Sequence, residues 1–165
     1  MAMKENMLLR YTKMSTKTVE MIVSLKVPDT TAITVMQTLH KIGFGKIKDV
    51  KRADYYKFYF EGYEQKFKNS ISKVDTLVNA NKHLFEFSIK NDGQAKLLVK
   101  NINDGGSGIL STLKNRLGFN NIKKVEKGTL WSLRADANEK EARKIAEKAA
   151  KELLVNENYQ EYIIL

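Results

Sequence analysis

Two stretches of the sequence decide the expected fold, LHKIGFGKIKDV (residues 39–50) and LKNRLGFNNIKKV (residues 113–125). Both place an apolar residue, a glycine and a phenylalanine in the same order, and Gly118 lies 75 positions after Gly43. Each glycine follows apolar residues spaced by three and four, a position where a helix ends and the backbone needs a left-handed residue. The recurrence indicates that one structural unit is encoded twice.

The same offset of 75 positions, applied without gaps, aligns most of the chain with itself. Chance matches would fall at different offsets, whereas these matches all fall at the same offset. We therefore interpret the chain as an internal duplication. The repeats cover residues 19–90 and 94–165, and residues 1–18 form a basic N-terminal extension. The pairs that keep their chemical character include Val27 with Ile102, Asp29 with Asp104, Ile47 with Ile122, Val50 with Val125, Glu64 with Glu139, Asn81 with Asn156, Phe87 with Tyr162 and Ile89 with Ile164.

Each repeat contains the pattern of a β-α-β-β-α-β unit. A strand-like stretch precedes an Asp that can cap a helix, and a second amphipathic stripe precedes a closing strand. The two middle strands, such as KIKDVKR (46–52) and YYKFYFE (55–61), are close enough in sequence to predict a hairpin. The expected fold class is α/β (α+β), a sandwich of two tandem ferredoxin-like units with antiparallel sheets. Units this small have marginal cores, which gives them a reason to pack together.

The second helix differs in volume between the repeats. Its apolar stripe carries Phe67 and Ile71 in the first repeat, whereas Ala142 and Ala146 stand at the matching positions. The two helices therefore cannot pack identically.

Composition excludes several classes of function. The 165 residues include no Cys and two His, which removes thiolate catalysis, zinc–sulfur sites and His-rich metal sites and fits a reducing, cytoplasmic location. No apolar run approaches the ~20 residues that span a bilayer. The net charge of +10 is spread almost evenly along the chain, which is typical of a solvated surface. We expect no catalytic residue, cofactor or metal.

Two motifs leave alternatives open. Gly105-Gly106-Ser107-Gly108 precedes a helix and could hold a phosphate, but it lacks the Lys-Ser/Thr of a phosphate-binding loop. A flexible helix entry is the favoured interpretation. The aromatic run over residues 55–60 falls on the third strand, where RNA-recognition domains place stacking rings. The glycines of that motif are missing, so we favour a strand with one face in the core.

The ordered motifs resemble the PurS family, the small subunit of phosphoribosylformylglycinamidine (FGAM) synthase, in two tandem copies. The helix end Ile42-Gly43-Phe44 and the strand Ile47-Lys48-Asp49-Val50 fit the first part of the family pattern. Leu153-Leu154-Val155-Asn156 and Tyr162-Ile163-Ile164 fit the last part. The family's Arg-x-Gly-Lys motif is changed in both copies, to residues 51–54 and 126–129.

The resemblance implies a structural subunit without chemistry of its own. Such a subunit joins a glutaminase subunit to an ATP-dependent synthetase subunit, so that glutamine-derived ammonia reaches formylglycinamide ribonucleotide in purine biosynthesis. A tandem chain is similar to a PurS dimer formed in advance, and two chains could associate into a four-repeat assembly. No membrane partner is expected.

Partner contacts are expected at four turns. Two are helix-to-strand turns, Gly43 to Lys46 and Gly118 to Asn121, and two are hairpin turns, Arg52 to Tyr55 and Lys127 to Leu130. Arg52 and Lys127 are predicted to be exposed and to affect assembly more than folding. The alternatives are a tandem RNA- or single-stranded-DNA-binding module, which would use Tyr56 and Phe58, and a regulatory domain that binds a small ligand between its units.

Overall fold

The computed structural model describes residues 15–165, and the larger part of the expected extension over residues 1–18 lies outside them. One antiparallel six-stranded sheet, in the order β3-β1-β2-β5-β4-β6, organises this part of the chain. The expected α/β class with an antiparallel sheet is therefore confirmed. The elements in chain order are β1 (Lys17–Leu25), α2 (Thr30–Lys41), β2 (Ile47–Phe60), α3 (Glu64–Ile71), β3 (His83–Glu86), β4 (Ala95–Asn101), α4 (Ser107–Asn115), β5 (Ile122–Ala135), α5 (Glu139–Ala149), the π-helix η1 (Ala150–Leu154) and β6 (Gln160–Ile164).

The two predicted hairpins are wrong. β2 and β5 each run without a break for 14 residues and pair with each other in antiparallel register. A two-residue hairpin needs residues with positive φ, and Gly128, the glycine nearest to either expected turn, is not among the positive-φ residues. The partner that the hairpin would have supplied comes instead from the other half of the chain.

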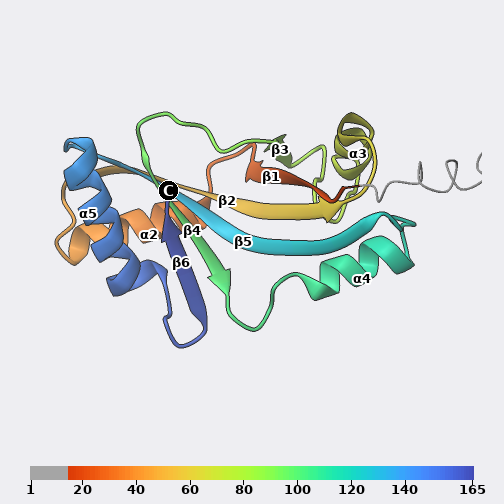
Figure 1. Cartoon of the computed structure of the whole chain (residues 1–165). Coiled ribbons are helices and arrows are strands. Elements are labelled where there is room, and N and C mark those ends of the chain that lie inside the picture. The colour runs from red at the N-terminus through yellow and green to blue at the C-terminus, as the bar shows by residue number, and fades with distance from the viewer. Residues whose placement is uncertain (1–14) are drawn as a thin grey trace, which may run out of the picture.

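Four helices cover one face of the sheet in two groups. Figure 1 shows α2 and α5 at one end of β2 and β5, and α3 and α4 at the other end. Buried side chains form a separate core under each group: Leu39, Val50, Leu133 and Ala146 belong to the first. Phe58, Phe67, Leu113 and Val125 belong to the second. We name these regions the α2–α5 lobe and the α3–α4 lobe.

Each lobe draws elements from both halves of the chain, because α2 and α3 precede the chain midpoint and α4 and α5 follow it. The long strands cross from one lobe to the other. Their register places Asp54 opposite Thr129, which is the residue 75 positions after it. Along the chain both halves have the same order of elements, namely strand, helix, long strand, helix and strand.

The helix ends agree with the sequence at three of four positions. Gly43 and Gly118 have φ values of 104° and 73°, so both adopt the left-handed conformation predicted after α2 and α4. Asp29 caps α2 and accepts a hydrogen bond of 2.9 Å from the Thr31 backbone N–H. The expected cap Asp104 does not cap α4, because Gly106 with a φ of 100° is the residue from which α4 starts.

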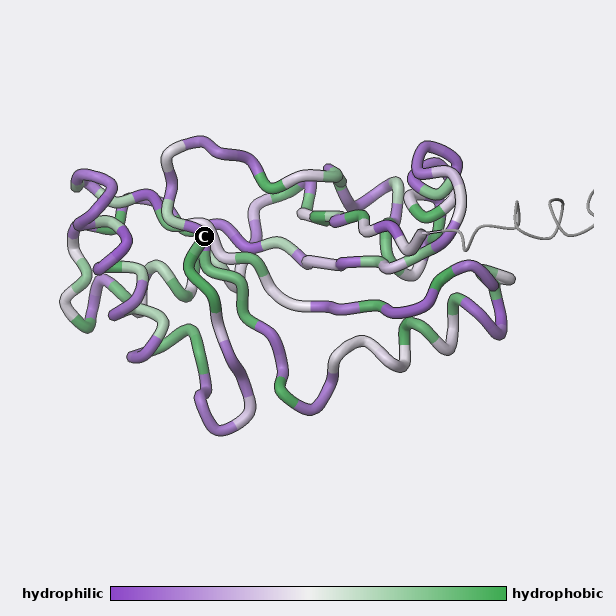
Figure 2. The backbone as a smooth tube through the Cα atoms, in the orientation of Figure 1, coloured by the Kyte–Doolittle hydropathy of each residue, from purple (hydrophilic) through white to green (hydrophobic). Residues whose placement is uncertain are grey.

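The helices bury their apolar stripes and expose their polar ones. Figure 2 shows hydrophilic and hydrophobic positions alternating along the turns of α5 and along the long strands. Within residues 15–165 no helix has the length and hydropathy needed to cross a membrane.

Candidate partner-binding grooves

A groove lies at the outer end of the α2–α5 lobe, between α5 and the turn that follows α2. It has a volume of about 570 Å³. Ile42, Gly43 and Lys46 line one wall, and Lys144 and Lys148 of α5 line the other. Ile42 is 47% exposed, which is unusual for so apolar a side chain. The groove therefore combines apolar residues with a charged rim, in which Glu141 and Glu152 lie beside the lysines.

An ion pair closes one side of this groove. Lys46 donates a hydrogen bond to the Glu141 carboxylate across the two halves of the chain. This hydrogen bond and the negative charge of Glu141 raise the pKa of Lys46. Lys46 thus anchors the turn to α5.

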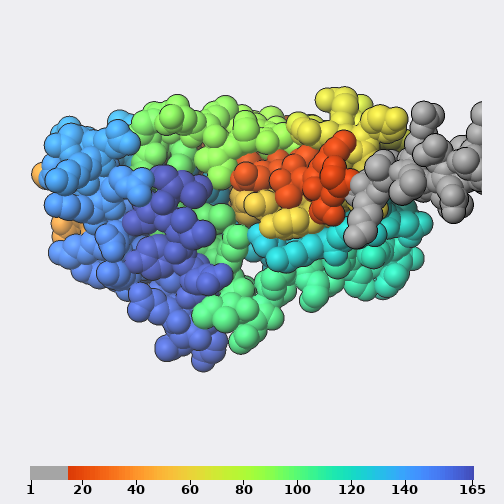
Figure 3. Space-filling view, in the orientation of Figure 1, coloured from red at the N-terminus to blue at the C-terminus, as the bar shows by residue number. Residues whose placement is uncertain are grey.

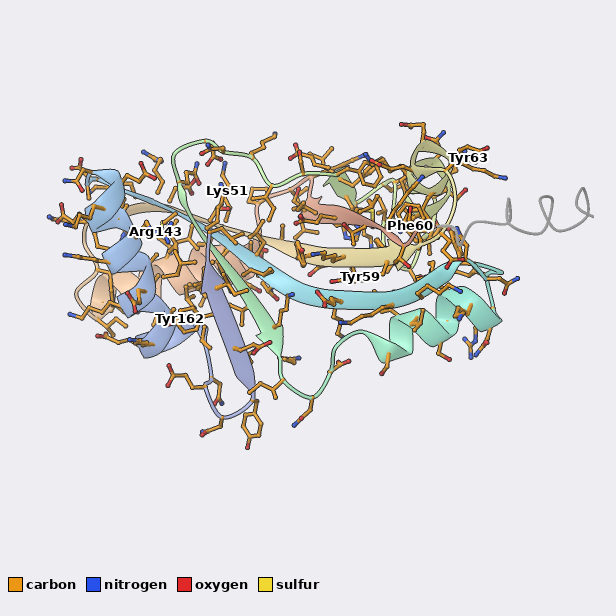
Figure 4. All side chains as sticks on the ribbon, viewed as in Figure 1. Lys51, Tyr59, Phe60, Tyr63, Arg143 and Tyr162 are labelled. Carbon is orange, nitrogen blue, oxygen red and sulfur yellow. The ribbon has the colours of Figure 1, made fainter. Side chains whose placement is uncertain are left out.

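A second groove occupies the corresponding place in the α3–α4 lobe. It has a volume of about 490 Å³ and lies between α3 and the turn that follows α4. Leu117 and Gly118 line the turn, and Lys66 lines the α3 side. Tyr63, at the start of α3, is 78% exposed, and it lies at the end of the molecule beside α3 in Figure 4. The Asn121 side chain donates a hydrogen bond of 2.9 Å to the Glu61 carbonyl oxygen and fixes the turn.

The two grooves are built from equivalent residues. Gly118 and Asn121 are the positions 75 residues after Gly43 and Lys46, and all four line the grooves. The second wall comes in each case from the other half of the chain. Sequence reasoning missed the lysines of α5 and Tyr63, because it assigned each helix to its own repeat. The exposed apolar residue before each glycine was the signal that could have indicated the grooves.

The residues of the expected hairpin turns do not form a common surface. Arg52 and Lys127 lie on the helix side and are bound in equivalent ion pairs, each of 2.9 Å, to Asp29 and to Asp104. Their side chains are only partly exposed, at 36% and 37%. Tyr55 and Leu130 lie on the opposite face, where they are buried against Leu98.

The ion pairs shift the pKa values of both aspartates. Burial tends to raise the pKa of Asp29, but hydrogen bonds from Arg52 and from two backbone N–H groups outweigh it, so the net shift is downward. The hydrogen bond and charge of Lys127 lower the pKa of Asp104. Arg52 and Lys127 therefore tie the helix starts of α2 and α4 to the sheet centre.

Among the described residues, 15–165, no helix lies on the other face of the sheet, which we name the helix-free face. In Figure 3 strands β1, β2 and β5 lie at the surface in the middle of this face, and α3, α4 and α5 appear at its rim.

A cluster of charged side chains surrounds Tyr59 on this face. The ammonium groups of Lys57 and Lys124 lie 5.5 Å and 5.2 Å from the centre of the Tyr59 ring. Burial opposes the shift, yet hydrogen bonds from Lys124 and Lys100 lower the pKa of Glu126 to about 2.

The aromatic residues expected to stack on nucleic acid face the wrong way. Phe58 is fully buried in the α3–α4 core, and Tyr56 packs against the same core from the helix side. Desolvation and the negative charge of Asp54 raise the pKa of Tyr56 to about 12. The prediction that this strand has one face in the core is confirmed.

No group of three or more His, Cys, Asp or Glu side chains within residues 15–165 is placed to hold a metal ion.

Comparison with known proteins assigns a similarity to the second half of the chain. Residues 98–165 match the PurS family, described as phosphoribosylformylglycinamidine (FGAM) synthase. The match begins within β4 and includes α4, β5, α5, η1 and β6. No curated protein matches the chain. The similarity to PurS that the motifs indicated is thus confirmed for residues 98–165.

Proposed function

We propose that this protein is a non-catalytic bridging subunit of FGAM synthase in purine biosynthesis. It holds the glutaminase and the ATP-dependent synthetase subunits together in the cytoplasm and supports the transfer of ammonia between them. The PurS match over residues 98–165 is the observation that carries this proposal. The role requires a rigid scaffold with exposed grooves and requires no nucleophile.

The proposal includes two tandem PurS-like copies, over residues 19–90 and 94–165, that form a pseudo-dimer within one chain. Three observations support this arrangement: the ungapped offset of 75 positions, the same element order in both halves, and the pairing of Asp54 with its own counterpart Thr129. The long strands β2 and β5 pair directly with each other, so the two copies share one sheet and are not two separate domains.

The two end grooves are proposed as the partner contacts. They lie at opposite ends of the long strands, so two different subunits could bind without colliding (Figure 1). The α2–α5 groove has a charged rim that includes Lys144, Lys148 and Glu152, and the α3–α4 groove presents Tyr63 and Leu117. The differing chemistry of the grooves matches a need for two partners.

Reconstitution tests the bridging role. The chain is mixed with the synthetase and glutaminase subunits from its own source, and glutamine-dependent FGAM formation is measured together with size-exclusion chromatography and light scattering. A rate and a co-eluting complex that both require the chain are expected. Full activity and assembly of the other two subunits without the chain would contradict the proposal.

Paired variants test the grooves separately. We expect Lys144→Glu with Lys148→Glu to lose one subunit from the complex, and Tyr63→Ala with Leu117→Asp to lose the other. Lys73→Glu with Lys82→Glu is the matched control, because these lysines are exposed and line neither groove. Retention of both subunits by both groove variants would remove the grooves from the proposal.

Self-association is proposed through the helix-free face. Leu84 and Ile163 are 55% and 54% exposed on this face, near its two edges. A second copy packed there would bury both residues in a four-repeat assembly. Light scattering should give twice the chain mass, reduced to the single mass by Ile163→Lys; a single mass for the unmodified chain would exclude this assembly.

Binding to single-stranded nucleic acid is a second candidate function. The ring of Tyr59 between Lys57 and Lys124 on the helix-free face is the observation that favours it. Binding should weaken steeply as salt is raised and should be lost in Tyr59→Ala but kept in Tyr63→Ala. Absence of binding at low salt would remove this function.

A further inference from the structure

A polar cavity lies between the two lobes on the helix side of the sheet. It has a volume of about 340 Å³ and is lined by Asp54, Tyr56, Asn101, Lys127, Thr129 and Gln160, among others. The middle parts of β2 and β5 form its floor, and β4, β6 and α4 contribute its walls. This volume is at the small end of the range of ligand sites.

The charges around the cavity are balanced except for one. Arg52 is paired with Asp29, and Lys127 is paired with Asp104. Asp54 has no ion pair or side-chain hydrogen bond with any residue in the range 15–165. A single carboxylate is therefore left without an ion pair beside two cations, Arg52 and Lys127, that are each paired with another aspartate.

The pKa of Asp54 is raised although the residue is exposed to solvent. Loss of hydration raises the pKa of Asp54, although Arg52, His83 and Lys127 act in the opposite direction and Asp29 adds to the increase. The side chain is still open to solvent through the mouth of the cavity. A cation that entered the cavity would meet this unpaired carboxylate.

Asymmetry between the halves produces the free carboxylate. Asp54 faces Thr129 across the pair of long strands, and Thr129 occupies the counterpart position in the other half. Two aspartates directly opposite would repel each other. The threonine removes that repulsion and adds a hydroxyl oxygen that can accept a hydrogen bond beside the carboxylate.

We propose that this cavity binds a small organic cation that carries a primary ammonium or guanidinium group. The Asp54 carboxylate accepts from the cationic head, and the Thr129 hydroxyl offers a further acceptor beside it, whereas the Asn101 amide oxygen already accepts a hydrogen bond from Gln160. The side of the cavity formed by Tyr56 and Val99 accommodates the apolar part of the ligand. An anion is disfavoured because Lys127 is held by Asp104.

Titration followed by amide NMR tests the site on the full chain. Agmatine and putrescine are the cationic probes, and 1,4-butanediol is the neutral control. We expect saturable shifts for the cations at the amides of Asn101, Gly128 and Thr129, and none for the diol. Absence of saturable shifts, or equal shifts with the diol, would overturn the proposal.

Two variants link the binding to Asp54. A hydrogen bond to a charged group contributes more than a neutral one, so Asp54→Asn should weaken binding about tenfold or more. Asp75→Asn makes the same chemical change at an exposed position outside the cavity and should leave the affinity unchanged. Unchanged affinity in Asp54→Asn would overturn the assignment.

A third variant gives a readout if Asp54→Asn fails to fold. Thr129→Lys places an ammonium group opposite Asp54, so it should abolish binding of the cations and raise the melting temperature. Retained binding in this variant would contradict the proposal.

The cation could also be a lysine or arginine side chain of a partner protein. Parallel losses of agmatine binding and of complex formation in Asp54→Asn would indicate this source, whereas loss of agmatine binding alone indicates a free ligand. The NMR result does not depend on the reconstituted synthase, so the site and the proposed function can fail separately.

Discussion

The two lobes have the same arrangement of elements, but the large side chains that fill their cores come from different elements. In the α3–α4 lobe, Phe67 of α3 stacks on Phe60 with ring centres 4.0 Å apart and contacts Phe119 edge to face. In the α2–α5 lobe the matching helix presents alanines, and Ala146, Ala149 and Ala150 are completely buried. Trp131, the counterpart of Tyr56, supplies volume from the sheet instead.

This difference shows that a backbone plan can be kept while the large side chains move from helix to strand. Interiors are packed to a nearly constant density, so a small residue on one element must be matched by a large residue or a closer approach on another. Each lobe takes one helix from each half of the chain, so the two halves need not carry the same side chains at matching positions. The predicted difference in packing between the two second helices is confirmed by these cores.

The largest expected effect comes from removing the aromatic centre of the α3–α4 lobe. Phe67→Ala should lower the free energy of unfolding by about 3–5 kcal/mol, because it leaves a cavity among Phe58, Phe60 and Phe119. Urea unfolding measures the change, with exposed Tyr63→Ala as the control. A loss below about 1 kcal/mol would show that the lobe can collapse around the vacancy.

The opposite change should break the α2–α5 lobe. Ala146→Leu adds volume at a position with no exposed surface and should cost about 1–3 kcal/mol through overpacking. The exposed Lys148→Leu on the same helix is the control and should have little effect on unfolding by urea. A neutral or stabilising Ala146→Leu would mean that this core has spare volume.

A third comparison concerns the start of α4, which has Gly106 as its cap where the matching helix α2 has Asp29. Gly106 at the start of α4 has a φ of 100°, and a Cβ there would lie 2.7 Å from the Val125 carbonyl oxygen. Gly106→Ala should therefore destabilise the protein by about 1–3 kcal/mol. Gly108→Ala, with open space around it, should be neutral or stabilising in thermal unfolding. Equal effects would contradict the strained geometry at Gly106.

The smallest expected effect separates the two equivalent ion pairs. The Asp29 side chain is 14% exposed and also caps α2, whereas Asp104 is 50% exposed and does not cap α4. Asp29→Asn should cost about 1 kcal/mol through loss of the charged pair with Arg52, because Asn can still cap the helix. Asp104→Asn should cost less, because exposed pairs are screened by water.

The pH dependence of unfolding sharpens this last comparison. Because the folded pKa of Asp29 is lowered, its contribution is complete above its unfolded pKa of about 3.9 and is lost as the pH falls through the folded pKa. The difference in stability between the unmodified chain and Asp29→Asn should therefore disappear at acidic pH. A difference that persists there would assign the effect to packing.

The structure also changes the expected effect of charge-reversing substitutions at the centre of the sheet. Arg52→Glu would place a carboxylate against Asp29, and Lys127→Glu would place one against Asp104. The expectation that these residues affect assembly more than folding came from placing them in exposed hairpin turns. Because both bind the segments at the helix starts, substitutions there will disturb folding as well.

Local patterns predicted what depends on neighbours in the sequence. Gly43 and Gly118 ended their helices as expected, since only a residue without a Cβ adopts the left-handed backbone there at little cost. Asp29 capped its helix for a similarly local reason. The turns that carry Lys46 and Asn121 were expected to contact partners, which stays a prediction; the grooves beside them have opposite walls from distant residues and were not foreseen.

The sequence by itself determined the order of helices and strands, the apolar stripes of the helices and three of the four expected helix ends. Only the tertiary structure decided that β2 and β5 continue through Ala53 and Gly128 and pair with each other. Alternating apolar residues are satisfied equally by a hairpin and by a long strand, since both place the same side chains on the core face. The choice depends on which strand is available as a hydrogen-bonding partner, and that partner lies in the other half of the chain.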